Sequence, residues 1–296
     1  MMTRPLTLGL ALSLGLALAA GPGPARATTA GFGFLRLGSS ARTAALGEAV
    51  TALESGAAGS YNPGALSEGR AFALTHAEWV EQIRHDYVTA NRPLGNGVAS
   101  ASLQVSHADG LERRTGPSAT ALGEFGVYEW AAGLTWARPV GPRLRLGGAI
   151  RALHQSIYDE AASGVAADAG LLYRLSSGLV AGAAVRHLGA MGDLDREATD
   201  LPMQVRAGVV GRPGDRWLVS GDLQWTRGAD TSVHAGLEGR VSRRLVLRAG
   251  YQTADGRGLS AGLGLRGRTW SLGYAYVPLS SGLGDGHRLS LSFASP

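Results

Sequence analysis

The chain has 296 residues, contains no cysteine and carries a formal net charge of +5, with arginine as its only strongly basic residue type. Without cysteine, neither a disulfide framework nor a thiolate metal site can form. The arginines are scattered and do not make the cluster or stripe that follows a phosphate backbone, which argues against nucleic-acid binding. Glycine contributes 45 residues, about twice the ordinary share of roughly 7 %. With 12 prolines and 17 % charged residues, the chain is neither collagen-like nor disordered, and one β-rich domain is favoured.

Residues 1–27 have the pattern of a secretory signal peptide. Arg4 precedes an apolar run at 6–20, and a small-x-small cleavage site follows at 25–27. We therefore expect export, with residence in the cell outer membrane. Beyond this segment no apolar run approaches the ~18 residues that a spanning helix requires, and the mean hydropathy is only +0.02. Membrane insertion would then depend on alternating strands, whose signal is hidden in hydropathy averages.

Residues 28–70 are rich in alanine, glycine and serine and lack strand alternation. Ser40 is placed to cap a short helix over 41–46, and Ser55 is placed to begin a second helical turn. Between them, residues 50–53 are predicted to be extended. Because its residues are small, this segment would fit inside a narrow lumen, and we predict a small helical hatch.

The tip of the predicted hatch is the sequence Asn62-Pro63-Gly64. Proline fixes its own φ and restricts the preceding residue to extended geometry. We therefore expect a stiff tip at Asn62 and Pro63, with Gly64 as a possible hinge. These three residues are the candidates for a structural or gating role in the hatch.

Two long strands joined by a tight turn are predicted for residues 124–158. Trp130 and Leu134 fall on one parity of the first arm, and Glu129 and Thr135 fall on the other. A period of two is typical of a strand with one apolar and one polar face. Each arm has roughly 13 to 15 residues, against ~5 to 6 in an ordinary strand and ~9 to 11 tilted residues for crossing a bilayer. The hairpin suits the wall of a membrane barrel.

The same pattern repeats through residues 71–296, and about fourteen strands can be counted. Connections alternate between short turns, which are rich in arginine, and longer loops, such as 109–123, 159–163 and 189–202, which are rich in acids. Outer-membrane barrels show this alternation, whereas a soluble β-sandwich, the alternative reading, does not. We predict an all-β fold: a transmembrane antiparallel β-barrel. The strands are expected to begin near Ala71, Arg84, Gly97, Glu124, Leu144, Gly164, Leu179, Met203, Trp217, Ser232, Leu245, Leu259, Trp270 and His287.

Polar side chains occupy the parity opposite to the apolar one along these strands. A soluble hydrophobic core would not bury such groups without partners. They are therefore assigned to a wet or plugged lumen. The lumen-facing polar candidates are Arg145, Arg151, Arg206, His234, Glu238 and Arg248.

An ordered set of short motifs resembles the PorV/PorQ family of FadL-like outer-membrane β-barrel proteins, over nearly all of residues 28–296. Hatch motifs are ARTAALGEA at 41–49 and YNPGAL at 61–66. Wall motifs follow in order: WAR at 136–138, RLG at 145–147, residues 158–173, RHLG at 186–189, LP at 201–202, GLE at 236–238, LRAGY at 247–251 and HRLSLSF at 287–293. The resemblance implies a fourteen-stranded barrel with an N-terminal hatch.

No arrangement for covalent chemistry stands out. GLGLRG at 262–267 matches G-x-G-x-x-G, but a dinucleotide loop must open a helix and this stretch lies in a strand and turn. The seven histidines include no i, i+4 pair, and no serine has a nucleophile context. We therefore predict no catalytic, cofactor-binding or metal residues, and a protein that is not an enzyme.

Two functions stay open. If the FadL likeness extends to function, the barrel passively transports a hydrophobic small molecule across the outer membrane. If the PorV likeness dominates, it is a non-enzymatic component or shuttle of a type IX-like protein-secretion system. The expected partners are outer-membrane lipid and either a hydrophobic ligand or secretion proteins, with no nucleic acid.

Overall fold

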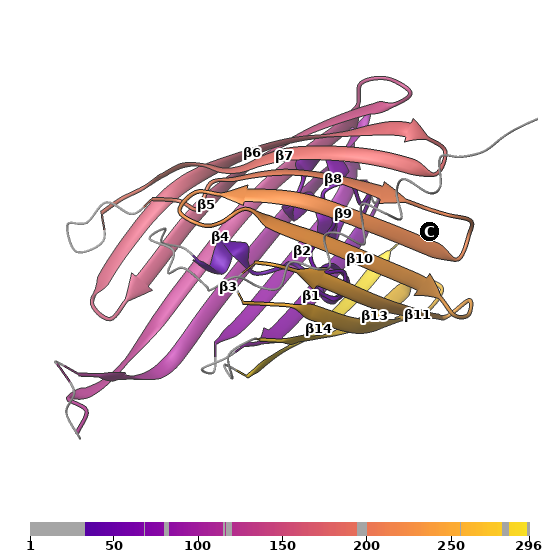
Figure 1. The fold of residues 1–296 in the computed structure, drawn as a ribbon. Helices are drawn as coiled ribbons and strands as arrows, with labels where there is room; N and C mark the ends of the chain where they lie inside the picture. Colours follow the sequence, from indigo (N-terminus) through magenta and orange to yellow (C-terminus); the bar gives the residue numbers. More distant parts are fainter. Residues whose placement is uncertain are drawn as a thin grey trace, which may run out of the picture.

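Fourteen antiparallel strands close into a barrel in the computed structural model, which describes residues 33–67, 69–79, 83–114, 116, 120–193, 200–254, 256–279 and 284–294. Each strand pairs with its sequence neighbours, and β1 pairs with β14 from Ala71↔Ala294 to Glu78↔His287, which closes the sheet (Figure 1). The predicted all-β barrel is confirmed. The signal-peptide prediction for 1–27 lies outside the described residues.

The strands differ in length, and the longest, β3, β4 and β6, have 17 residues each. Their bounds are β1 Ala71–Glu78, β2 Arg84–Leu94, β3 Gly97–Arg113, β4 Gly123–Pro139, β5 Leu144–Ile157, β6 Glu160–Ser176, β7 Leu179–Met191, β8 Gln204–Gly211, β9 Trp217–Thr226, β10 Ser232–Arg240, β11 Leu245–Gln252, β12 Leu259–Arg266, β13 Trp270–Pro278 and β14 Asp285–Ala294.

Strand alternation located the wall closely, since thirteen of the predicted starts lie within two residues of the observed ones. The exception is β6. The long loop predicted at 159–163 is wrong, because β5 and β6 stay paired up to Ile157↔Glu160 and a tight turn joins them, with Tyr158 at φ 57°. The small residues after Glu160 show no apolar alternation, yet their backbone groups pair with those of β5. In the same way β3 and β7 run on into the loops predicted at 109–123 and 189–202.

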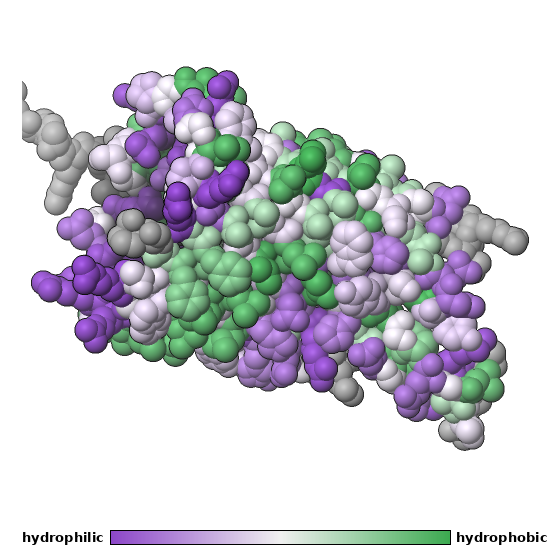
Figure 2. Space-filling view, turned by 180° about the vertical axis from the view of Figure 1, so that it is seen from behind, coloured by the Kyte–Doolittle hydropathy of each residue, from purple (hydrophilic) through white to green (hydrophobic). Residues whose placement is uncertain are grey.

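The outer face of the wall is apolar and the inner face is polar, as the parity predicted. Leu134 and Ile150 are 61 % and 64 % exposed, whereas Thr135 and Arg151 on the opposite parity are 9 % and 5 % exposed. Apolar side chains gather over the middle of the barrel, and hydrophilic side chains gather mostly towards its two ends (Figure 2). An exposed apolar surface of this kind is what lipid covers on a transmembrane barrel.

The described part of the N-terminal segment forms four short helical pieces that lie within the barrel (Figure 1). They are η1 Gly33–Arg36, α2 Ala41–Ala45, η2 Ala57–Ser60 and η3 Pro63–Ala65. We call residues 33–66 the hatch. Ser40 caps α2 through a hydrogen bond from the Thr43 N–H, in agreement with the predicted cap. Within the described ranges, no helix has the length and apolar content needed to cross a membrane.

One detail of the hatch differs from the expectation. Residues 50–53 are not extended, because the Leu53 N–H donates to the Val50 carbonyl oxygen at 3.0 Å and closes a turn. The turn is favoured by a wall carboxylate, Asp222, whose Oδ2 accepts the N–H groups of Val50 and Thr51. A partner 171 residues away in sequence therefore sets the local conformation.

Candidate functional site

Inward-facing glycines allow the hatch to approach the wall backbone. A Cβ added at Gly182 of β7 would lie 2.5 Å from the Thr51 carbonyl oxygen, and one at Gly236 of β10 would lie 2.7 Å from the Leu46 carbonyl oxygen. Any larger residue would push the hatch away from the wall. Equally close approaches join Gly147 to Pro63, Gly170 to Asn62, Gly250 to Gly47 and Gly262 to Ala45.

The predicted hatch motif lies against β5 and β6. Asn62 is fully buried, has φ −145° and ψ 108°, and its Nδ2 donates to the carbonyl oxygens of Thr51 at 2.7 Å and Leu171 at 2.9 Å. Its Oδ1 accepts the Gly64 N–H at 2.9 Å. A Cβ at Gly64 would lie 2.7 Å from the Leu171 Cα, so close packing already explains this glycine. A hinge role for Gly64 stays a prediction.

Arg206 of β8 and Asp222 of β9 form the most deeply buried ion pair among the described residues, and both contact the hatch. Their side chains are 1 % and 0 % exposed, and Arg206 Nη2 lies 3.2 Å from Asp222 Oδ2. The same guanidinium donates to the Glu48 carbonyl oxygen at 2.6 Å and to Thr51 Oγ1 at 3.0 Å. Asp222 Oδ2 also accepts the Thr51 hydroxyl at 2.7 Å. Two wall side chains from β8 and β9 thus hold residues 48–51 of the hatch through polar contacts.

Three more of the predicted lumen residues also touch the hatch backbone. His234 Nδ1 donates to the Gly47 carbonyl oxygen at 2.7 Å, which fixes the tautomer of the neutral ring. Arg151 pairs with Asp168 at 2.8 Å and reaches the Ser60 carbonyl oxygen at 3.5 Å. Arg145 donates to the carbonyl oxygen of Leu66.

The remaining two candidates, Glu238 and Arg248, belong to one charged cluster on the short-turn side of α2. Glu238 accepts from Arg42 of the hatch at 2.8 Å, from Arg248 at 2.7 Å and from Arg266 at 3.5 Å. Three guanidinium groups around one carboxylate leave an excess of positive charge. The structure therefore distributes the six predicted residues around the hatch and brings only Glu238 and Arg248 into direct contact with each other.

Sequence reasoning missed Glu48, Asp168 and Tyr61 as residues of this site. Glu48 pairs with Arg257 at 3.0 Å, and Asp168 accepts the His187 N–H at 2.8 Å where β7 bulges and His187 takes φ 57°. Burial of Tyr61 raises its pKa to about 12, and the nearby Glu48 carboxylate adds to this effect. Parity could have identified Asp168, which lies on the inward face of β6. Glu48 and Tyr61 lie in the hatch motifs at 41–49 and 61–66, but those motifs carry no local signal of which wall residues they contact.

The space left inside the barrel is divided by the hatch. Next to Tyr61 there is only about 10 Å³, lined mainly by polar side chains such as Gln104, Arg186 and Gln204, which is roughly the space for one water molecule. Two larger cavities lie at the end of the barrel where the short turns are. One of about 430 Å³ borders α2, β1 and β14, and the other of about 700 Å³ lies beside the β8–β9 turn.

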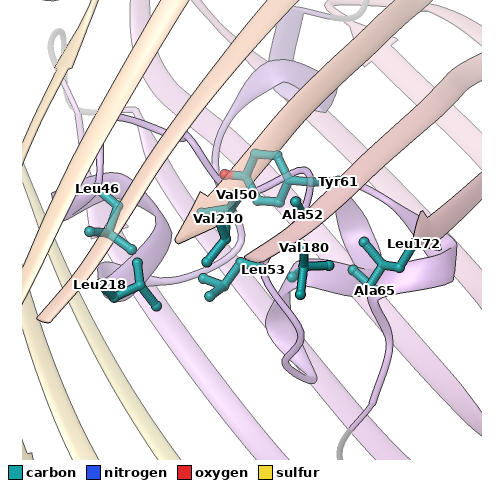
Figure 3. Close-up of a cluster of buried hydrophobic side chains, with 11 residues drawn as sticks. Leu46, Val50, Ala52, Leu53, Tyr61, Ala65, Leu172, Val180, Val210 and Leu218 are labelled. Atoms are coloured by element: carbon teal, nitrogen blue, oxygen red, sulfur yellow. The ribbon is translucent and has the colours of Figure 1, made fainter. Parts of the chain in front are cut away.

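Apolar contacts join the hatch to the wall in three separate clusters. The largest places Leu46, Val50 and Leu53 of the hatch against Leu172, Val180, Val210 and Leu218 of β6 to β9 (Figure 3). A second packs Phe34 and Leu35 against Ala131, Leu153, Ala166 and Leu201. The third packs the alanines of α2 against Ala275 and Val277 of β13. Among the described residues, no group of three His, Asp or Glu side chains could hold a metal ion.

A closed barrel with an apolar outer face and a folded hatch in its lumen defines a plugged transmembrane β-barrel. No protein-family model matches this chain, and no curated protein sequence matches it either. Solved structures do match. The toluene transporter TbuX of Ralstonia pickettii is 15 % identical, with a TM-score of 0.63 over 87 % of this chain and 97 % of that one.

Two further structures support the same comparison. The monoaromatic hydrocarbon channel CymD is 13 % identical, with a TM-score of 0.68 over 88 % of this chain and 97 % of that one. A Pseudomonas aeruginosa FadL homologue is 13 % identical, with a TM-score of 0.54 over 92 % of this chain and 99 % of that one. The chain therefore has the fold of FadL-like fourteen-stranded outer-membrane barrels.

Proposed function

We propose that this protein is an outer-membrane channel for passive entry of a small hydrophobic molecule, of about the size of one aromatic ring. The observation that carries the proposal is a FadL-like barrel whose lumen is closed by a hatch, with a cavity of about 430 Å³ directly beneath it. Ligand sites in proteins commonly have ~300 to 1,000 Å³. The similar structures TbuX and CymD are described as a toluene transporter and a monoaromatic hydrocarbon channel.

The mechanism follows from how the hatch is held. Its contacts with the wall are hydrogen bonds, ion pairs and apolar packing, all of which can reopen without covalent change. A solute moving down its own gradient needs no cofactor and no nucleophile. Asn62, Pro63 and Gly64 are the proposed structural residues of the hatch, because they anchor it to β5 and β6.

Membership in the PorV/PorQ family, and with it a role in protein secretion, is the second candidate. It is favoured by the ordered motifs from 41–49 to 287–293 in the sequence. The two candidates predict different cellular defects, because one concerns a small solute and the other concerns exported proteins.

Uptake of radiolabelled toluene by lipopolysaccharide-containing vesicles with the purified protein tests the first candidate, because a phospholipid bilayer alone does not hold back a small apolar solute. Uptake faster than in the same vesicles without protein is expected, and equal rates would refute the transport proposal. In cells, transport predicts slower toluene uptake by a deletion strain with unchanged surface proteins. Loss of surface proteins with unchanged uptake would favour secretion instead. Membrane residence is checked by fractionation together with N-terminal sequencing, for which cleavage after Ala27 is expected.

A further inference from the structure

The hatch is held unevenly around the barrel. Residues 46–53 are fixed to β8, β9 and β10 by the Asp222 carboxylate, the Arg206 guanidinium and the His234 ring, all of them buried. Asn62 adds a buried amide contact to β6. This side of the hatch is a polar attachment that would be costly to break, because each group would be left without a partner away from water.

The sector of α2 is different. Its residues Ala41, Ala44 and Ala45 pack on Ala275 and Val277 of β13, and a Cβ at Gly262 of β12 would touch the Ala45 side chain. Within the described part of the chain, α2 makes three hydrogen bonds to two residues of the wall strands. The Ala41 N–H donates to Ser290 Oγ at 2.7 Å. Arg42 donates to both carboxylate oxygens of Glu238, at 2.8 and 3.0 Å, while 28 % of its side chain stays exposed.

Apolar surface continues above α2 towards the long-loop end. The Trp79 side chain packs against this alanine cluster, and the Arg257 guanidinium lies 5.0 Å from the centre of its ring. A Cβ at Gly286 of β14 would meet the Trp79 ring, so glycine makes room for the indole there. Trp79, Val277, Ala275 and the α2 alanines therefore form a continuous apolar strip inside the barrel.

On the short-turn side of α2, this apolar strip leads into the cavity of about 430 Å³. Its side towards β1, β13 and β14 is built from small residues, namely Ala71, Ala73, Thr75, Ser271, Gly273, Ser290 and Ser292. The rest of its lining includes Arg42, Arg248, Arg266 and Arg268. The neighbouring cavity of about 700 Å³ is lined by Arg212, Arg216, Arg240 and Asp215 among others. A neutral hydrophobic molecule would be better accommodated along the uncharged β1, β13 and β14 side of the first cavity than among the charges of the second, because it cannot replace the water that solvates them.

We infer that the solute crosses the hatch in the α2 sector, between α2 and strands β12, β13, β14 and β1, and that α2 is the part of the hatch that moves. This inference rests on the proposed function and specifies its path. The Trp79 side chain covers the entrance at the long-loop end. The contact of the α2 alanines with β12 and β13 is the gate, and the 430 Å³ cavity is the exit chamber. The polar attachment of residues 46–53 and Asn62 keeps the rest of the hatch in place while α2 shifts. The gate selects small neutral apolar solutes, because the surfaces that meet there are alanines of α2 and small or apolar residues of β12 and β13.

A disulfide lock tests the gate directly, since the chain has no cysteine of its own. A Cβ at Gly273 would lie 3.5 Å from the Ala41 Cβ, within the range of roughly 3.5 to 4.5 Å that a disulfide needs. The variant A41C/G273C is placed in lipopolysaccharide-containing vesicles, and uptake of radiolabelled toluene is measured after oxidation and again after reduction. Oxidation should reduce uptake to the protein-free rate and reduction should restore it, while A41C and G273C alone should not respond.

A second pair of variants checks the path without a cross-link. Ala73→Trp fills the 430 Å³ cavity and should slow uptake, whereas Ser177→Trp, which lines the 700 Å³ cavity, should leave it unchanged. If unmodified protein gives no uptake, both the proposed function and this path fail. If it gives uptake that neither the oxidised lock nor Ala73→Trp reduces, or that Ser177→Trp reduces instead, the path is refuted and the proposed function stands.

Discussion

Replacing Asp222 with alanine should release the central part of the hatch while leaving the barrel closed. The substitution removes the acceptor of the Val50 and Thr51 N–H groups and of the Thr51 hydroxyl, and it leaves the Arg206 guanidinium buried without its carboxylate. Breaking a buried ion pair by removing one partner costs ~3 to 5 kcal/mol. The wall should keep its pairing, because Asp222 contributes its side chain and not its backbone to the hatch.

The size of the effect can be expressed as a population. At about 1.4 kcal/mol for each factor of ten, the displaced state of the hatch should become roughly one hundred to several thousand times more populated. Hydrogen exchange at the amides of Val50 and Thr51 reports this directly, because both donate to Asp222. Their protection should fall by a comparable factor, while amides of β9 keep theirs.

The double variant D222A/R206M is the matched control. Removing both members of a buried ion pair is often close to neutral, so hatch protection should recover partly. The double variant still lacks the carboxylate acceptor of the Val50 and Thr51 N–H groups and the Arg206 donors to the Glu48 carbonyl oxygen and Thr51 Oγ1. Unchanged protection of Val50 and Thr51 in the single variant would refute the reasoning that Asp222 holds the hatch. Equal loss in the two variants would show that these lost hydrogen bonds outweigh the unpaired charge of Arg206.

Three further predictions concern the wall and the hatch. Leu134→Arg places a charge on the lipid face and should destabilise the barrel by ~2 to 4 kcal/mol near the bilayer midplane, and Thr135→Arg on the inner face should be milder; a refolding titration that gives equal costs would contradict the assigned faces. Removing residues 30–68 should leave a folded barrel with raised conductance in a planar bilayer, and unchanged conductance of a folded variant would argue against a plug. Pro63→Ala should increase hatch exchange more than it lowers the free energy of barrel unfolding, because Pro63 packs at Gly147 and holds Asn62 extended; the reverse order would count against a stiff tip.

The wall could be predicted from the sequence because its determinants are local and periodic. Leu134 and Thr135 are neighbours in sequence, and their opposite burial follows from strand geometry alone. The start of β6 was missed because Ala161 and Ala162 give no apolar alternation, although their backbone groups pair with β5. Periodicity reports alternating apolar side chains and is silent where a paired strand is built from small residues.

The hatch was predictable only in part, for a different reason. The cap at Ser40 and the extended Asn62 depend on adjacent residues and were found. The turn at Val50 depends on Asp222, and the close packing of Gly64 depends on Leu171. Such contacts join residues more than a hundred positions apart, and a single sequence contains no local signal for them.

The closing pair of strands has a consequence for assembly. The hatch precedes β1 in the chain, whereas β14 comes at the end, and the Ala41 N–H reaches Ser290 across 249 positions. Synthesis therefore produces the hatch before any wall strand, and its contact residue Ser290 only with the final strand. Pairing of β1 with β14 removes the last free edge of the sheet, so a hatch that docks afterwards can enter only through an end of the barrel. Docking before the seam closes avoids that passage and is the route we expect. Insertion of the wall and docking of the hatch are then one coupled folding event, with the seam beside α2 as its final step.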